Sequence, residues 1–202
     1  MNNFTKKIFF FAAVVSVGYA LFSCGGEDEK KFDVFNVDST RIASEVADTI
    51  LGVKFNPPKL WNNSASEIGE KRSMNLDFSK RTMRSFVYRA TNLFYNAGRG
   101  SVLNIGYVTL RDRNENGEAS LDDYVTQSTE KWKNAKVRKS TFSKNELEFT
   151  RLDIDYGAWH TVRVIFYNAS GELIQFEYST QSENRETELP WIEASIGTIR
   201  LM

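Results

Sequence analysis

The chain has 202 residues, of which 41% are hydrophobic and 13% aromatic, enough for one globular domain with a sizeable apolar core. Its 26 basic and 26 acidic residues balance, so neither nucleic acid nor an anionic membrane surface is indicated as a partner. The single cysteine and single histidine exclude an internal disulfide and a Cys/His zinc cluster.

Residues 1–23 are predicted to be a lipoprotein signal peptide and not part of the fold. Two lysines open the segment, and residues 8–22 form an apolar run that is too short for an ordinary membrane-spanning helix. The run ends at Leu21-Phe22-Ser23-Cys24, which resembles the lipobox of bacterial lipoproteins. Cys24 would then carry a diacylglycerol and a further acyl chain, and more than one chain gives stable membrane anchoring.

Residues 24–38 are predicted to be an acidic tether that leads to a single globular α/β domain over residues 39–202. The acidic run directly after the cysteine resembles the surface-export signal of Bacteroidetes lipoproteins. The alternative is a plain linker that faces the periplasm. Both interpretations predict a protein anchored by lipid in a bacterial outer membrane. Removing the signal peptide takes away two lysines, which leaves 24 basic against 26 acidic residues.

The first half of the globular region combines helix and strand patterns. In residues 39–51 apolar side chains recur at every fourth position, which predicts a helix that stops at Gly52. The sequence Asn56-Pro57-Pro58 forbids a regular helix or a central strand at that point. Residues 64–67 carry a capping-box pattern for a short helix, and residues 85–111 are typical of strands joined by a turn.

The second half begins with a helix that is predicted to open at Ser120, with Asp123 as its capping-box partner. Two strands are predicted next, over residues 137–142 and 147–156. The apolar residues of the second strand change phase along its length. This change predicts a β-bulge near Thr150-Arg151.

The strongest strand pattern lies in residues 161–180, where two alternating runs are joined by a turn at residues 168–171. This pattern predicts a β-hairpin around which the domain is built. A closing helix is predicted over residues 188–201, with Pro190 in its first turn. Gly197 inside that helix indicates close packing against the sheet.

The order of these elements resembles that of the PsbP-like fold. Three segments carry the resemblance: Asn56-Pro57-Pro58-Lys59-Leu60-Trp61, Ser120-Leu121-Asp122-Asp123-Tyr124 and Leu189-Pro190-Trp191-Ile192-Glu193. The resemblance spans roughly residues 53–202 and leaves residues 62–84 without a counterpart. It implies an α+β fold, an α/β/α sandwich in which an antiparallel sheet of about six strands is flanked by helices. Members of known role mostly bind proteins and share no active site, which implies a binding function.

Residues 112–123 approximate a calcium-binding EF-hand loop. Oxygen-bearing side chains recur at alternate positions around a central glycine, as Ca²⁺ coordination requires, and the candidate ligands are Asp112, Asn114, Asn116 and Asp123. The segment before the loop has a strand pattern instead of the helix of an EF-hand. The alternative is therefore a polar loop whose last residues cap the helix that follows.

Asp153 and Asp155 fall on one face of a predicted strand, about 7 Å apart, a spacing close to that of glycosidase carboxylates. His160 follows closely enough to serve as a general base. The alternative is a structural role for all three. The tryptophans are candidates for stacking on a sugar or a partner, although at least three are predicted to be in the core: Trp61, Trp132, Trp159 and Trp191.

The sequence therefore predicts a lipid-anchored, non-enzymatic envelope domain that binds another envelope protein and needs no cofactor. The alternative is a surface lipoprotein that binds a glycan, a small ligand or, weakly, Ca²⁺. A hydrolase that uses Asp153, Asp155 or His160 is the third hypothesis.

Overall fold

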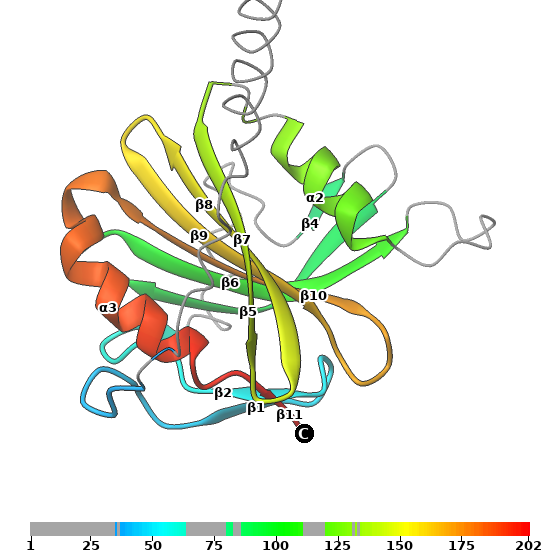
Figure 1. Ribbon diagram of the computed structural model, residues 1–202. Coiled ribbons are helices and arrows are strands. Elements are labelled where there is room, and N and C mark those ends of the chain that lie inside the picture. The colour runs from blue at the N-terminus through cyan, green and yellow to red at the C-terminus, as the bar shows by residue number, and fades with distance from the viewer. Residues whose placement is uncertain are drawn as a thin grey trace, which may run out of the picture. The chain divides into compact units, whose positions relative to one another are not determined.

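The computed structural model describes residues 35, 37–63, 80–82, 86–110, 120–130, 132 and 134–202. Within them lie a large antiparallel sheet of eight strands and a small antiparallel sheet of three (Figure 1). The large sheet consists of β3 (Asn62–Asn63), β4 (Lys80–Thr82), β5 (Phe86–Asn96), β6 (Ser101–Leu110), β7 (Lys136–Lys144), β8 (Leu147–Tyr156), β9 (Trp159–Tyr167) and β10 (Leu173–Gln181). Its order is β3-β5-β6-β10-β9-β8-β7, and β4 also pairs with β5.

The small sheet consists of β1 (Val46–Asp48), β2 (Val53–Phe55) and β11 (Arg200–Leu201). The helices of the described residues are α2 (Leu121–Glu130), the short 3-10 helix η2 (Ser182–Asn184) and α3 (Arg185–Ile196). α2 begins after Ser120, whose Oγ accepts a hydrogen bond from the backbone N–H of Asp123 at 3.4 Å, so the predicted cap is confirmed. The predicted short helix at residues 64–67 lies outside the described residues.

The predicted hairpin is confirmed as β9 and β10, which lie in the interior of the large sheet. Its turn is held by Asn168, whose Oδ1 accepts hydrogen bonds from the N–H groups of Ser170 and Glu172 at 3.0 and 2.9 Å. Gly171 has φ +75°, a value that L side chains rarely adopt. The turn chemistry that the sequence predicted is therefore the one the chain uses.

Each face of the large sheet carries a hydrophobic core, and a different helix packs on each face (Figure 1). On the α3 face, Ile192 and Ile196 of α3 share a core with phenylalanines of the central strands and with Val53 and Phe55 of the small sheet. On the α2 face, Tyr124 and Val125 of α2 pack on a second core. Alternate residues of one strand therefore belong to different cores.

The expected sheet of about six strands is an underestimate, since the large sheet has eight and a second sheet is present. The small sheet shares the α3 face with α3 itself, so strands do part of the covering that the expected sandwich assigned to helices. The architecture remains antiparallel β with helices on both faces.

The helix predicted over residues 39–51 is wrong, because this segment forms β1 and a turn. The buried Asp48 carboxylate accepts hydrogen bonds from the N–H groups of Ile50 and Leu51, both at 3.0 Å, and Gly52 has φ +66°. Asp48 also accepts a hydrogen bond from Thr91 of β5 at 2.7 Å. These hydrogen bonds stabilise the turn. Ile50, which the helix pattern would bury, is instead 69% exposed.

The bulge predicted near Thr150-Arg151 is also wrong, because β8 pairs in continuous register with both β7 and β9. Leu147 and Phe149 belong to the core under α3, and Leu152 and Ile154 belong to the core under α2. The change of phase therefore marks the point along β8 where the apolar residues change from the α3 face to the α2 face.

The closing helix begins earlier than predicted, at Arg185, and ends at Ile196. Pro190 consequently lies inside α3 and not in its first turn. The close packing predicted at Gly197 is present, but not against the sheet: a Cβ there would lie 2.9 Å from Cγ2 of Val37 and 3.0 Å from Cβ of Phe35. The segment that enters the domain thus crosses the end of α3.

Candidate functional site

The hairpin of β8 and β9 gathers most of the residues to which the sequence assigned chemistry. The two strands turn at Gly157, which has φ +56°, and Asp155 pairs with His160 while Tyr156 pairs with Trp159. Because side chains alternate along a strand, Asp155 and His160 lie on the α3 face. Tyr156 and Trp159 lie on the α2 face. The hairpin therefore has a polar side and an aromatic side.

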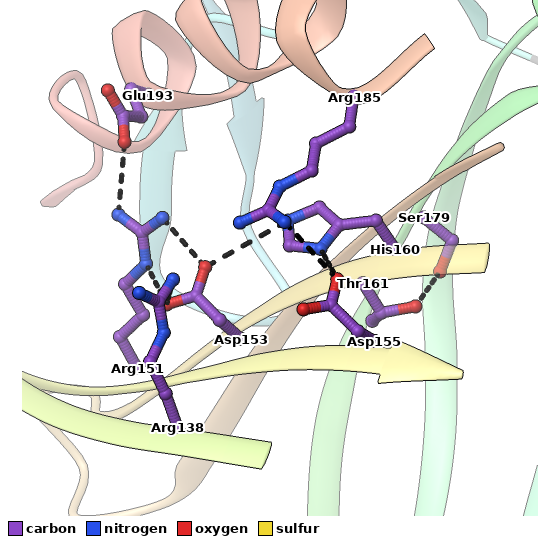
Figure 2. A network of polar contacts seen from close by, with 9 residues as sticks. All are labelled: Arg138, Arg151, Asp153, Asp155, His160, Thr161, Ser179, Arg185 and Glu193. Atoms are coloured by element: carbon purple, nitrogen blue, oxygen red, sulfur yellow. Dashed lines mark hydrogen bonds and ion pairs between the residues drawn. The ribbon is translucent and has the colours of Figure 1, made fainter. Parts of the chain in front are cut away.

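The polar side is centred on an ion pair between Arg151 and Asp153 (Figure 2). Arg151 donates from Nε to Oδ2 of Asp153 at 3.0 Å and from Nη2 to Oδ1 at 2.9 Å. Its remaining nitrogen, Nη1, donates to Glu193 of α3 at 3.3 Å. The two paired side chains are only 3% and 4% exposed, so this is a buried, bidentate pair within β8, and the contact of Arg151 with Glu193 links it to α3.

His160 continues the network toward the end of the hairpin. Its Nδ1 lies 2.6 Å from Oδ1 of Asp155, and Nη1 of Arg185 lies 3.5 Å from the same oxygen. Its Nε2 is buried without a hydrogen-bond partner and lies 3.9 Å from Oδ1 of Asp153. Figure 2 shows Arg185 reaching from α3 toward Asp155 and His160.

The three residues of the hydrolase hypothesis are thus brought together, but not in an arrangement open to a substrate. Asp153 and His160 are 4% and 1% exposed, and Asp153 is bound by Arg151 on both oxygens. A general base or nucleophile must contact the reacting group, whereas His160 is buried and Arg151 occupies both oxygens of Asp153. Asp155 is 38% exposed, but it is bound by His160 and Arg185. Their geometry is that of a buried network joining β8, β9 and α3.

The pKa of Asp155 reflects its place at the edge of this network. Burial raises the pKa of the carboxyl group, but the hydrogen bond from His160 and the charge of Arg185 outweigh burial. The pKa therefore lies below its ordinary value. The ionised form of Asp155 is the one the folded protein favours.

Asp155→Asn is expected to lower stability near neutral pH and to lose this effect in acid. Because the folded pKa lies below the ordinary value of 3.8, the carboxylate stabilises the fold above about pH 4, and this contribution vanishes as the pH falls through the folded pKa. Urea unfolding of wild type and variant should differ at about pH 6 and converge as the pH falls below the folded pKa. Glu148→Gln, which removes an exposed carboxylate from the same strand, is the control. Equal pH profiles for wild type and Asp155→Asn would contradict the assignment.

The aromatic side of the hairpin is exposed. Tyr156 and Trp159 are 46% and 43% exposed, and Val137 of β7 is 36% exposed. Trp132, which follows α2, packs edge-on against Tyr156 with ring centroids 5.1 Å apart. We call these four residues the aromatic corner. A pocket of about 390 Å³ adjoins it and is lined by Trp159 together with Ala158, Gln181, Ser182 and Glu183.

The tryptophans divide unevenly between core and surface. Trp61 is buried in the core under α3, and its Nε1 donates to the buried carboxylate of Glu188 at 3.1 Å. Trp132 packs against the core under α2, and Trp191 is half-buried. Trp159 differs from the other three because it is the first residue of β9, directly after the two-residue turn Gly157-Ala158. That signal was present in the sequence as Tyr156-Gly157-Ala158-Trp159.

The predicted calcium loop lies largely outside the described residues. Asp112, Asn114 and Asn116 lie outside the described residues, while Asp123 is exposed on α2. In the part of the chain that the structure describes, no group of three or more His, Cys, Asp or Glu residues is placed to hold a metal ion. Cys24 also lies outside this part, in which no helix is long and apolar enough to cross a membrane.

Comparison with known proteins bears on the fold. No protein-family model matches the sequence, and no curated protein matches it significantly. The structure is similar to the solution structure of cyanobacterial PsbP (CyanoP) from Synechocystis sp. PCC 6803, with a TM-score of 0.50 over 91% of this chain and 99% of that chain. The two sequences are 14% identical, so the likeness concerns the fold alone. The antiparallel architecture and this likeness together establish a PsbP-like fold.

Proposed function

We propose that this chain is a bacterial lipoprotein, anchored in the outer membrane through Cys24, whose domain binds another envelope protein and performs no catalysis. The observation that carries the proposal is that the polar and the aromatic side chains of the β8–β9 hairpin lie on opposite faces and differ in exposure. Arg151, Asp153 and His160 are buried in a polar network, while Tyr156 and Trp159 are exposed. Exposed aromatic side chains supported by a rigid strand pair are typical of protein-binding surfaces.

The anchor rests on the sequence. A lipobox ending at Cys24 follows an apolar run, and an acidic tether separates it from the domain. The acidic run resembles the surface-export signal of Bacteroidetes lipoproteins, and a plain linker facing the periplasm is the alternative. The glycan, small-ligand and Ca²⁺ alternatives rest on the pocket beside Trp159 and on the loop at residues 112–123, most of which lies outside the described residues.

Replacing Tyr156 and Trp159 together with serine is expected to abolish partner binding while the domain stays folded. The wild-type protein, tagged and cross-linked in its own envelope, should capture the partner at a constant stoichiometry. Large aromatic residues at an interface centre contribute about 2 kcal/mol or more each, so capture should fall by more than tenfold. Thermal unfolding of the variant should show that the domain still folds cooperatively, because neither side chain belongs to the buried cores.

Two further variants complete this test. Ile50→Ser removes an apolar side chain that is 69% exposed elsewhere on the domain, and it should leave capture unchanged. Cys24→Ala should release the protein from the membrane fraction and reduce capture of a membrane-bound partner. Undiminished capture by the Tyr156→Ser/Trp159→Ser variant would refute the aromatic corner as the binding surface.

A further inference from the structure

Strand β7 forms one edge of the large sheet. On its inner side it pairs with β8 along its whole length, from Lys136 opposite Asp155 to Lys144 opposite Leu147. On its outer side, no strand among the described residues pairs with it. Within the described part of the chain, backbone N–H and C=O groups along the outer edge of this nine-residue strand are therefore open to another extended segment.

The first half of this edge is basic. Lys136, Arg138 and Lys139 are all exposed, and their side chains divide between the two faces of the sheet. Arg138 is 58% exposed and reaches Asp153 only at 3.9 Å, while Lys139 makes a solvent-exposed pair with Asp122. Exposed pairs of this kind contribute little, so these cations remain available to a further anion. Asp155, opposite Lys136, is already bound by His160 and Arg185.

An apolar contact lies within the basic half. Val137 is exposed between Lys136 and Arg138, and it sits on the same face as Tyr156 and Trp159. A strand laid against β7 would therefore meet cations at alternate positions on the α3 face. On the other face it would meet the aromatic corner.

We propose that β7 receives an extended acidic segment of the envelope partner as an additional strand, with carboxylates at alternate positions beside Lys136 and Arg138. This inference rests on the proposed function and specifies the partner's recognised feature. Main-chain hydrogen bonds supply the affinity in strand addition, and side chains at alternate positions supply the specificity. The lysines also keep two copies of this edge apart by like-charge repulsion, so the same charges that prevent self-pairing select an acidic strand.

The test uses the full chain in detergent and a nine-residue labelled peptide that alternates glutamate with threonine and valine, matching the length of β7. Fluorescence anisotropy should report binding. Hydrogen exchange should slow at the amides of β7 and at no other strand of the sheet. Methylating alternate peptide nitrogens removes the donors that a strand must supply, and it should abolish binding. A peptide with lysine in place of glutamate should not bind.

Lys136→Glu/Arg138→Glu is expected to weaken peptide binding at least about tenfold, because opposite charges beside an added strand become like charges. Lys54→Glu/Lys59→Glu makes the same change in net charge away from β7, and it should bind as wild type does. The proposal is overturned if backbone methylation or the β7 charge reversal leaves binding intact, if no binding occurs, or if the outer amides of β7 are already protected without peptide. If the charge-reversed protein still captures the envelope partner, strand addition at β7 is refuted, but the proposed protein-binding function is not.

Discussion

Arg151→Met is expected to destabilise the domain by about 3–5 kcal/mol, because it leaves the Asp153 carboxylate buried without its partner. Asp153 is 4% exposed, and Arg151 contributes both of its close hydrogen bonds, at 3.0 and 2.9 Å. Arg138 lies 3.9 Å away and is mostly exposed, so it is poorly placed to replace the lost cation. Guanidinium chloride unfolding at neutral pH measures the effect directly.

Two controls distinguish the stability effect of breaking the buried pair from the effect of removing a charge elsewhere. Arg138→Met removes a cation from the same carboxylate at the surface and should cost less than about 1 kcal/mol. Arg151→Met combined with Asp153→Leu removes both charges and should recover much of the loss, since a buried pair is often replaceable by apolar side chains. A loss below about 1 kcal/mol for Arg151→Met would contradict the expectation that the buried carboxylate depends on this pair.

Gly106→Ala is expected to cost at least about 3 kcal/mol or to prevent folding, at or beyond the upper end of typical overpacking effects. A Cβ at this position of β6 would lie 2.0 Å from the carbonyl oxygen of Arg89 and 2.9 Å from Cα of Ala90. Both contacts are with backbone, which has little freedom to move. The close approach arises because β5 shifts register between Ala90 and Asn92, directly opposite Gly106.

Gly98→Ala is the matched control. Its Cβ would meet only Oδ1 of Asn96, at an ordinary contact distance of 3.5 Å, so its stability should stay within about 0.5 kcal/mol of wild type. Thermal unfolding of both variants, with circular dichroism as the probe, distinguishes local crowding from a general cost of replacing glycine. Wild-type stability for Gly106→Ala would mean that β5 and β6 are free to separate at the bulge.

The bulge itself shows where local patterns fail. The sequence predicted a bulge in β8 from a change in apolar phase, but the bulge lies in β5, between Ala90 and Asn92. In β8 the phase changes because each face of the strand enters a different core. A pattern of one strand cannot distinguish these cases, because the covering elements α2 and α3 come from distant parts of the chain.

Asp48 illustrates the same limit for a helix. Apolar spacing alone favoured a helix over residues 39–51. The Asp48 side chain instead caps a turn and accepts hydrogen bonds from Thr91 and Asn92 at the bulge of β5, at 2.7 and 2.6 Å. Partners more than forty positions away in the chain thus decide the local conformation.

The sequence by itself determined the features that depend on near neighbours. These are the hairpin of β9 and β10 with its Asn168 turn, the helix that opens after Ser120, and the strands β7 and β8. Alternation, turn residues and capping are local physics, so one sequence suffices to indicate them.

Only the tertiary structure decided which of the polar residues are buried and which are exposed. Asp153, Asp155 and His160 were identified as neighbours, but whether they face solvent depended on α3, which supplies Glu193 and Arg185. It also decided that Trp159 is exposed while Trp61 is buried. Burial is a property of the packed whole, because a charge or an aromatic ring is covered by segments that its own neighbours in sequence do not specify.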